Sequence, residues 1–246
     1  MASLEDPPLL SVVVPCLNEQ SNIVSCLQKL QRYRVGGAAT ETRLGLEIIV
    51  VDGGSTDNTC ELARRHADCV MTTPAGRARQ MNAGAAVARG QWLLFLHTDT
   101  QLPENVGDWL NKLISTAKLW GFFELRLSGG HPFFRVIERA ICWRARLSRV
   151  ATGDQCQFVR RSVFAQLQGF AALPLMEDIE LSRRLRKLSS PLIWRSPVCT
   201  SSRRWERDGI LTTVLLMWWL RLAFFMGVSP SRLHRMYYRQ GDASGE

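Results

Sequence analysis

Short apolar runs alternate with helical segments over the first hundred residues, and this alternation limits the possible fold more than any other feature. The runs, rich in valine, leucine or isoleucine, are residues 9–14, 46–51, 69–72 and 91–96. Helical patterns lie between them, over residues 22–33, 57–66 and 76–89. Short apolar runs bounded by Pro, Gly or polar residues are typical of buried strands. Strands that alternate with helices form right-handed crossovers. The sequence therefore predicts an α/β fold with a mainly parallel sheet flanked by helices.

The chain beyond residue 100 is less regular. Helices are predicted over residues 103–119, 131–150 and 176–188, and strands over 121–128 and within 152–161. A length of 246 residues fits one large domain with a small appendage. We predict one domain over residues 1–205 and a helical extension over residues 206–246.

Residues 210–228 are almost entirely apolar, and three interpretations of this segment are open. A membrane-spanning helix needs about 20 apolar residues, so the length allows a span. Arg221 lies inside the segment, however, at a cost of roughly 2.5–3.5 kcal/mol near a bilayer centre. Trp218 and Trp219 lie mid-segment, whereas tryptophan favours the membrane interface. We therefore favour a helix that lies on a membrane or a hydrophobic acceptor over one that packs on the domain or one that spans.

The net charge of +9 is unevenly distributed. Residues 1–123 carry −1 and residues 124–246 carry +10, almost all of the excess being arginine. Because guanidinium groups bind phosphates and carboxylates, the candidate partners are nucleic acid, phosphorylated ligands and anionic membranes. A solvated basic surface is the alternative for any single arginine.

The start of the chain and its cysteines bear on localisation. Residues 1–8 are acidic and contain proline, unlike a secretory signal. The seven cysteines are scattered and form no C-x-x-C pair. They are typical of reduced thiols, so we expect a cytoplasmic protein.

Polar or glycine-rich residues follow three of the predicted strands. These residues are Pro15, Asn18 and Glu19 after the first strand, Asp52 and Gly53 after the second, and His97 and Asp99 after the later one. Ligands bind beyond the carboxyl ends of parallel strands, so one shared crevice is expected. Asp52 is suited to a ribose or base, although an ordinary turn with Asp57 at the next helix explains the same residues. The chain lacks the G-x-G-x-x-G and G-x-x-x-x-G-K-[ST] motifs.

Carboxylates at two places are candidates for chemistry. Asp99 follows an apolar strand and could hold Mg²⁺ or Mn²⁺ together with a substrate diphosphate. His97 is either a second ligand, a sugar contact or a structural histidine. Glu177 and Asp178 begin a helix after apolar residues, so one of them is either a general base or an acid that favours the helix dipole.

Together these segments resemble the family 2 inverting glycosyltransferases of the GT-A fold. The resemblance covers residues 9–205 and rests on the runs SVVVPCLNEQSNI, EIIVVDGGSTDNT, GRARQMNAGAAVARGQWLLFLHTDT and GDQCQFVRRSVFAQLQGF, followed by MEDIELSRRL. It implies a nucleotide-binding half over residues 9–100 and an acceptor half over residues 101–205. The ending RRWERDGILTTVLLMWWLRLAFFMGVSP resembles a compact subgroup labelled near carotenoid-acid glucosyltransferases and arsenosugar pathways.

The resemblance also implies roles for individual residues. Nucleotide binding is implied for Pro15, Asn18, Glu19 and Asp52, and metal binding for Asp99 with His97. We expect Gly53, Arg77 and Asn82 to contact the nucleotide as well. Asp178 is the implied catalytic base, beside Glu177. Contacts with the diphosphate or acceptor are expected from Arg79, Asp154, Arg204 and Trp205.

The chain departs from the family pattern at three places. Asp52 is followed by Gly53 instead of a second acid, His97 replaces the first acid of D-x-D, and Ser201 replaces the glutamine of Q-x-x-R-W. The last change weakens a polymerase-like interpretation.

The implied activity is inverting transfer of a hexose from a UDP- or GDP-sugar, assisted by Mn²⁺ or Mg²⁺. The acceptor would carry a hydroxyl or carboxyl group and could be hydrophobic. We expect peripheral contact of residues 210–228 with the inner face of the cell membrane, and no nucleic acid. The alternatives are a sugar-phosphate nucleotidyltransferase and a non-catalytic basic protein that binds membrane or nucleic acid.

Overall fold

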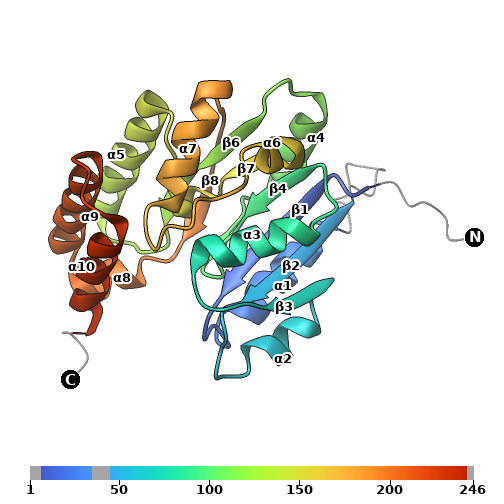
Figure 1. Ribbon diagram of the computed structural model, residues 1–246, viewed down its shortest axis with the longest axis horizontal. Helices are drawn as coiled ribbons and strands as arrows, with labels where there is room; N and C mark the ends of the chain where they lie inside the picture. The colour runs from blue at the N-terminus through green and yellow to red at the C-terminus, as the bar shows by residue number, and fades with distance from the viewer. Residues whose placement is uncertain (1–6, 35–44, 243–246) are drawn as a thin grey trace, which may run out of the picture.

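The computed structural model describes residues 7–34 and 45–242. The elements are β1 (Leu10–Cys16), α1 (Ile23–Arg32), β2 (Leu46–Asp52), α2 (Thr59–Arg64), β3 (Cys69–Thr72), α3 (Arg77–Val87), β4 (Trp92–Phe95), β5 (Thr100–Gln101), α4 (Val106–Ser115), β6 (Trp120–Leu127), α5 (Pro132–Ser148), η1 (Gly153–Gln155), β7 (Phe158–Arg160), α6 (Arg161–Gln166), α7 (Glu177–Leu188), β8 (Leu192–Thr200), α8 (Arg203–Asp208), α9 (Ile210–Phe225) and α10 (Pro230–Asp242). The strands form one eight-stranded sheet with helices on both faces (Figure 1). The predicted α/β class is confirmed.

The order of the strands in the sheet is β3-β2-β1-β4-β7-β6-β8-β5. The four strands from β3 to β4 are parallel, as predicted for the first half of the chain. Strand β7 runs antiparallel to both β4 and β6, β8 is parallel to β6, and β5 is antiparallel to β8. The sheet is therefore parallel where the nucleotide-binding half is expected and mixed beyond it.

The central strands are apolar throughout because both of their faces are covered. Val12 and Val14 of β1 pack into the core with α1 and α4, whereas Val13 packs into the core with α3, α6 and α7. Successive side chains of a strand point to opposite faces of the sheet. A strand that is buried on both faces therefore has an apolar residue at almost every position.

The last two long helices pack beside α5 and α7, at the end of the molecule opposite α2 (Figure 1). Leu220 and Ala223 of α9 and Leu233 of α10 form a buried cluster with Val150 and Ile179. The packed face of α9 fits the interpretation that residues 210–228 contact the domain. No helix in residues 7–34 and 45–242 has both the length and the apolar composition needed to cross a membrane. The domain division after residue 205 stays a prediction.

Candidate active site

The loops after β1 and β2 meet where these parallel strands end. Cys16 and Asp52 are partners in the sheet register. Asn18, in a left-handed conformation with φ 54°, donates its backbone N–H to Ser55 Oγ at 2.8 Å. Its side-chain Oδ1 accepts the Thr56 N–H at 3.0 Å. The predicted proximity of the two loops is therefore present in the structure.

Asp52 makes most of its hydrogen bonds within its own turn, and its Oδ1 also accepts from Cys16 Sγ of β1 at 3.8 Å. The side chain is buried, and its Oδ2 accepts the N–H groups of Gly54 at 2.9 Å and Ser55 at 2.8 Å. Burial raises the pKa of Asp52, but the hydrogen bonds from Ser55 and Gly54 outweigh burial and hold it below its usual value. Asp57 accepts the Thr59 N–H at the start of α2. The turn accounts for these contacts, and a contact between Asp52 and a nucleotide stays a prediction.

Two other predicted nucleotide contacts belong to the framework at these strand ends. Gly53 is buried beside Gln80, whose Nε2 donates to the carbonyls of Cys16 at 2.8 Å and Val51 at 2.9 Å. Pro15 is a buried residue of β1. Gln80 thus ties together the ends of β1 and β2.

Glu19 and Asn82 also make specific intramolecular contacts. Glu19 donates its N–H to Thr59 Oγ1 at 2.8 Å and accepts from Asn22 Nδ2 at 2.6 Å. The Asn82 amide pairs with the backbone of Phe170, donating at 2.8 Å and accepting at 2.9 Å. Asn82 therefore anchors the segment after α6 to α3.

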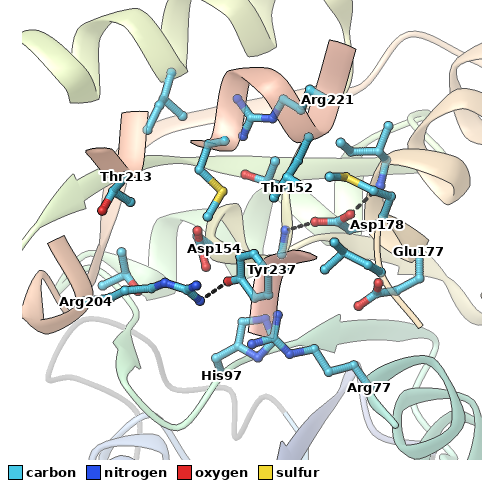
Figure 2. A pocket seen from close by; sticks show the side chains of 18 of the residues that line it. Arg77, His97, Thr152, Asp154, Glu177, Asp178, Arg204, Thr213, Arg221 and Tyr237 are labelled. Carbon is cyan, nitrogen blue, oxygen red and sulfur yellow. Dashed lines mark hydrogen bonds between the residues drawn. The ribbon is translucent and has the colours of Figure 1, made fainter. Parts of the chain in front are cut away.

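A cavity of about 370 Å³ lies between the strand ends and the C-terminal helices (Figure 2). Eight of the predicted residues line it: Arg77, His97, Asp99, Asp154, Glu177, Asp178, Arg204 and Trp205. The other predicted residues, Pro15, Asn18, Glu19, Asp52, Gly53, Arg79 and Asn82, are not in its wall. The structure thus gathers the predicted metal, base and acceptor residues around one space.

Asp178 is held firmly at the start of α7. Its Oδ2 accepts the Gly153 N–H at 2.6 Å and its Oδ1 accepts the Ile179 N–H at 2.7 Å. A Cβ built on Gly153 would lie 2.8 Å from His97 Nε2 and 3.6 Å from Asp178 Oδ2. A side chain at this position would displace the His97 ring, so Gly153 lets the segment after β4 and the start of α7 approach each other.

Burial shifts the pKa of three groups in the cavity. Burial raises the pKa of Glu177 to about 7, and the neighbouring Asp178 adds to this rise. Burial also raises the pKa of Asp178, although the N–H groups of Gly153 and Ile179 oppose it. Burial and the nearby Arg77 lower the pKa of His97 to about 4, so its imidazole is neutral at pH 7.

His97 and Asp99 fit a divalent cation that shares its ligands with a substrate. Asp99 is exposed, and its Oδ1 accepts from Thr100 Oγ1 at 3.2 Å. A neutral imidazole can bind a metal. The described residues contain no group of three or more His, Cys, Asp or Glu side chains that could hold an ion. A cation at Asp99 would therefore need oxygen ligands from a bound diphosphate or water.

Arg204 is oriented by helix α10. Its guanidinium lies 3.9 Å from the centre of the Tyr237 ring, and its Nη1 donates to the Tyr237 hydroxyl (Figure 2). Its Nε also lies 3.5 Å from Asp208. Arg79 is exposed on α3.

Sequence reasoning missed two arginines of the cavity wall, Arg144 of α5 and Arg221 of α9. The sequence could have identified Arg221, because this charged residue interrupts an apolar segment. Arg144 is one of several arginines on an amphipathic helix, and nothing in the sequence distinguishes it from the others.

Two curated relatives show local similarity. The chain is 34% identical over 104 residues to a protein of Mycobacterium bovis (strain BCG / Pasteur 1173P2) named PGL/p-HBAD biosynthesis glycosyltransferase, covering 39% of this chain and 38% of that protein. It is 26% identical over 145 residues to glycosyltransferase GlyG of Streptococcus pneumoniae serotype 4, covering 54% and 46%. The chain thus spans less than half the length of these relatives.

Solved structures with low sequence identity share the fold. S. aureus TarS 1–349, crystallised with UDP, superposes with a TM-score of 0.62 at 18% identity, covering 78% of this chain and 60% of that chain. The Pyrobaculum calidifontis mannosyltransferase PcManGT, crystallised with GDP-Man and Mn²⁺, gives 0.58 at 18% identity, covering 98% and 74%. The family model of glycosyl transferase family 2 matches residues 11–151, more than half of the chain. Over residues 11–151 the chain therefore carries the pattern of glycosyl transferase family 2, and it belongs to that family.

Proposed function

We propose that this protein transfers a hexose from a nucleotide-diphospho-sugar, a UDP- or GDP-sugar, to an acceptor bound in the cavity, with inversion at the anomeric carbon. The observation that carries the proposal is the carboxylate of Asp178, which lies in the cavity wall and is oriented by two backbone N–H groups. Family membership supports it, as do the names of the relatives and of the structural neighbours crystallised with UDP or GDP-Man.

The donor lies on the side of the cavity formed by the ends of the parallel strands. Asp99 and the neutral His97 would hold Mn²⁺ or Mg²⁺, which neutralises charge on the diphosphate when bound. Arg77, at the start of α3, supplies further positive charge on that side. Neutralising the leaving group is usually a large part of catalysis in such transfers.

Asp178 acts as the general base. The acceptor oxygen attacks the anomeric carbon, the bond from that carbon to the diphosphate breaks, and the acceptor proton passes to Asp178. The nucleoside diphosphate leaves with the bonding electrons. The raised pKa of Asp178 makes it a stronger base than an exposed aspartate, which suits proton transfer near neutral pH.

The alternative activities are less consistent with the observations. A sugar-phosphate nucleotidyltransferase needs a glycine-rich first loop with basic residues, and the loop here is PCLNEQSN. A non-catalytic membrane- or nucleic-acid-binding protein has no use for an oriented acid in a cavity. The resemblance to the compact subgroup near carotenoid-acid glucosyltransferases and arsenosugar pathways stays a prediction about the acceptor.

We also propose peripheral contact with the inner face of the cell membrane, which would place the protein in the cytoplasm. Helices α5 and α9 are neighbours (Figure 1), and both expose large apolar side chains. These are Phe133, Val136, Trp143, Leu147, Leu211, Leu215, Trp218, Trp219, Leu222 and Phe225. The charge of +10 over residues 124–246 complements an anionic surface. A hydrophobic acceptor could enter the cavity from this side.

The test is transfer, or donor hydrolysis without acceptor, from a panel of UDP- and GDP-sugars followed by mass spectrometry. Asp178→Asn should bind nucleotide normally and lose transfer by about 10²–10⁴-fold, the usual contribution of a general base. Asp108→Asn, a change at an exposed acid of α4, is the matched control and should leave transfer unchanged. Near-normal turnover by Asp178→Asn would contradict the assignment of the base.

A further inference from the structure

Two arginines in the cavity wall have no role in the reaction proposed above. Arg144 comes from α5 and Arg221 from α9, and both side chains are only partly exposed. Figure 2 shows Arg221 on the side of the view opposite Arg77 and His97, with Asp178 between them. Arg221 thus lies on the acceptor side of the cavity, and Arg144 lines the same cavity.

Neither arginine is neutralised by an ion pair within residues 7–34 and 45–242. Arg144 donates to the Val150 carbonyl at 3.1 Å and to Gln155 Oε1 at 3.5 Å, and both acceptors are neutral. Its Nε is buried without a hydrogen-bond partner. Guanidinium groups away from water are costly unless an anion pairs with them.

Arg221 is close enough to Arg144 for its charge to lower the pKa of Arg144. Burial lowers the pKa of Arg144 to about 10, and Arg221 is the next cause. Asp178 and Asp154 partly offset the effect of burial on the pKa of Arg221. Asp178 is already held by two N–H groups and is the proposed base, so it is not free to serve as a permanent partner for either arginine.

The wall around the arginines is apolar. Ile137 and Ile141 of α5 and Met217 and Leu220 of α9 line the same cavity. A ligand that fills this side must therefore present an anionic group to the arginines and an apolar part to the helices.

We propose that Arg144 and Arg221 form an anion site for the acceptor, whose carboxylate or phosphate they bind beside Asp178. The acceptor is thus an amphiphile with an anionic oxygen group. This assignment rests on the proposed function for its place in catalysis, but the anion site itself can be tested without any transfer reaction.

The test is binding of short amphiphiles below their critical micelle concentration, followed by the fluorescence of the tryptophans in the cavity wall. Octyl phosphate and octanoate should bind to the wild-type chain, and octanol should bind at least tenfold more weakly. The tighter of the two anions identifies phosphate or carboxylate as the preferred group. Equal binding of octanol and both anions would overturn the proposal.

Variants locate the site. Arg221→Met and Arg144→Met should each weaken octyl phosphate or octanoate binding at least tenfold and leave octanol binding unchanged. Arg139→Met, at an exposed arginine of α5, is the matched control and should bind like wild type. Because Arg221→Met removes a poorly neutralised cation, it should also raise the melting temperature, which separates loss of the site from failure to fold.

Nucleotide titration distinguishes this site from the donor site. Binding of UDP and GDP, measured by calorimetry with Mn²⁺, should be the same in Arg221→Met and wild type. A loss of nucleotide affinity with intact anion binding would mean that Arg221 serves the donor diphosphate, which contradicts the proposal. Anion binding without transfer from any donor sugar would instead contradict the proposed function alone.

Discussion

Glu177 and Asp178 are adjacent in the chain, yet their carboxyl groups meet different surroundings. Burial raises the pKa of both, but Asp178 also accepts two backbone N–H groups, which favour its charged form. Glu177 is buried, and the main influences on its pKa are burial and the neighbouring charge of Asp178. Neighbouring acids with such different environments suit different roles. We assign proton transfer to Asp178 and expect Glu177 to stay protonated to a higher pH than an exposed glutamate.

Glu177 should make the stability of the protein depend on pH. The folded chain holds the Glu177 proton up to about pH 7, whereas the ordinary value is 4.5. This stabilisation is full below pH 4.5 and is lost as the pH rises through 7. Because of Glu177, the free energy of unfolding of the wild-type protein should fall by about 2–3 kcal/mol between pH 5 and pH 8. Glu177→Gln should lack this fall. Urea unfolding of both proteins at the two pH values measures the difference.

The control for this experiment is Glu104→Gln, a change at an exposed glutamate before α4. It should keep the pH dependence of the wild-type protein. If Glu177→Gln shows that same dependence, burial is not what controls this carboxyl group.

Asp99 should control metal-dependent nucleotide binding. Asp99→Asn replaces the exposed carboxylate with a neutral amide, which is a weaker ligand for a hard cation. We expect UDP or GDP affinity in the presence of Mn²⁺ to fall at least tenfold, about 1.4 kcal/mol, and the metal-free affinity to change little. Calorimetric titration with and without Mn²⁺ measures both; an unchanged affinity with Mn²⁺ would rule out Asp99 as the metal contact.

At the scale of elements, strand β8 illustrates what a local pattern can miss. Residues 192–200 contain Arg195, Ser196 and Pro197, and they did not suggest a strand. The strand forms because it pairs with β6, and the register shifts between the pairs Phe123–Trp194 and Leu125–Val198. The irregular stretch accommodates Pro197, which lacks an N–H for regular pairing. A partner from a distant part of the chain therefore decides this element.

Helix α3 depends on a small residue for its position on the sheet. A Cβ on Gly84 would lie 2.5 Å from Val13 Cγ1 and 2.9 Å from Val51 Cγ2. Both valines are stiff, β-branched residues of the buried strands. Gly84→Ala should therefore destabilise the protein by about 1–3 kcal/mol, the usual cost of overpacking.

The matched control is Gly107→Ala on α4, where an added Cβ meets nothing within 4 Å. There the alanine should be neutral or slightly stabilising, because it lowers the entropy of the unfolded chain. Urea midpoints of the two variants test the comparison, and equal midpoints would show that α3 can move away from the sheet without cost.

At the scale of the whole molecule, charge and exposed apolar side chains lie on the same half of the chain. Residues 124–246 carry the positive charge, and α5 and α9 carry exposed Trp143 and Trp219. Singly exposed apolar residues are common, but so many on neighbouring helices mark an interaction surface. This arrangement is the basis of the proposed contact with anionic membranes.

The membrane contact predicts binding to vesicles that depends on lipid charge and salt. The protein should cosediment with phosphatidylglycerol vesicles more strongly than with phosphatidylcholine vesicles, and less at high ionic strength. The double variant Trp143→Ser/Trp219→Ser should bind at least tenfold more weakly. Ile114→Ser, at an exposed residue of α4, is the control. Equal binding of the double variant and wild type would contradict the assignment of this face.

Local pattern was sufficient for the parallel half of the sheet and for the loops at its strand ends. The apolar runs of β1, β2 and β4 are long enough to identify buried strands, and parallel strands bring their carboxyl ends to one edge. The prediction of Asp99 and Asp178 as site residues rested on this reasoning and on the family resemblance, and the structure brings both to one cavity.

Only the tertiary structure revealed the side of the cavity where we propose that the acceptor binds. Arg144 and Arg221 lie on separate helices far apart in the chain, and their approach to Asp178 depends on how α5, α7 and α9 pack. Periodicity tells which face of a helix is apolar, but it does not tell which helices meet. Asp52 is a second example. The sequence allows it to be a turn residue or a ligand, and its hydrogen bonds with its own loop can be identified only once the backbone is placed.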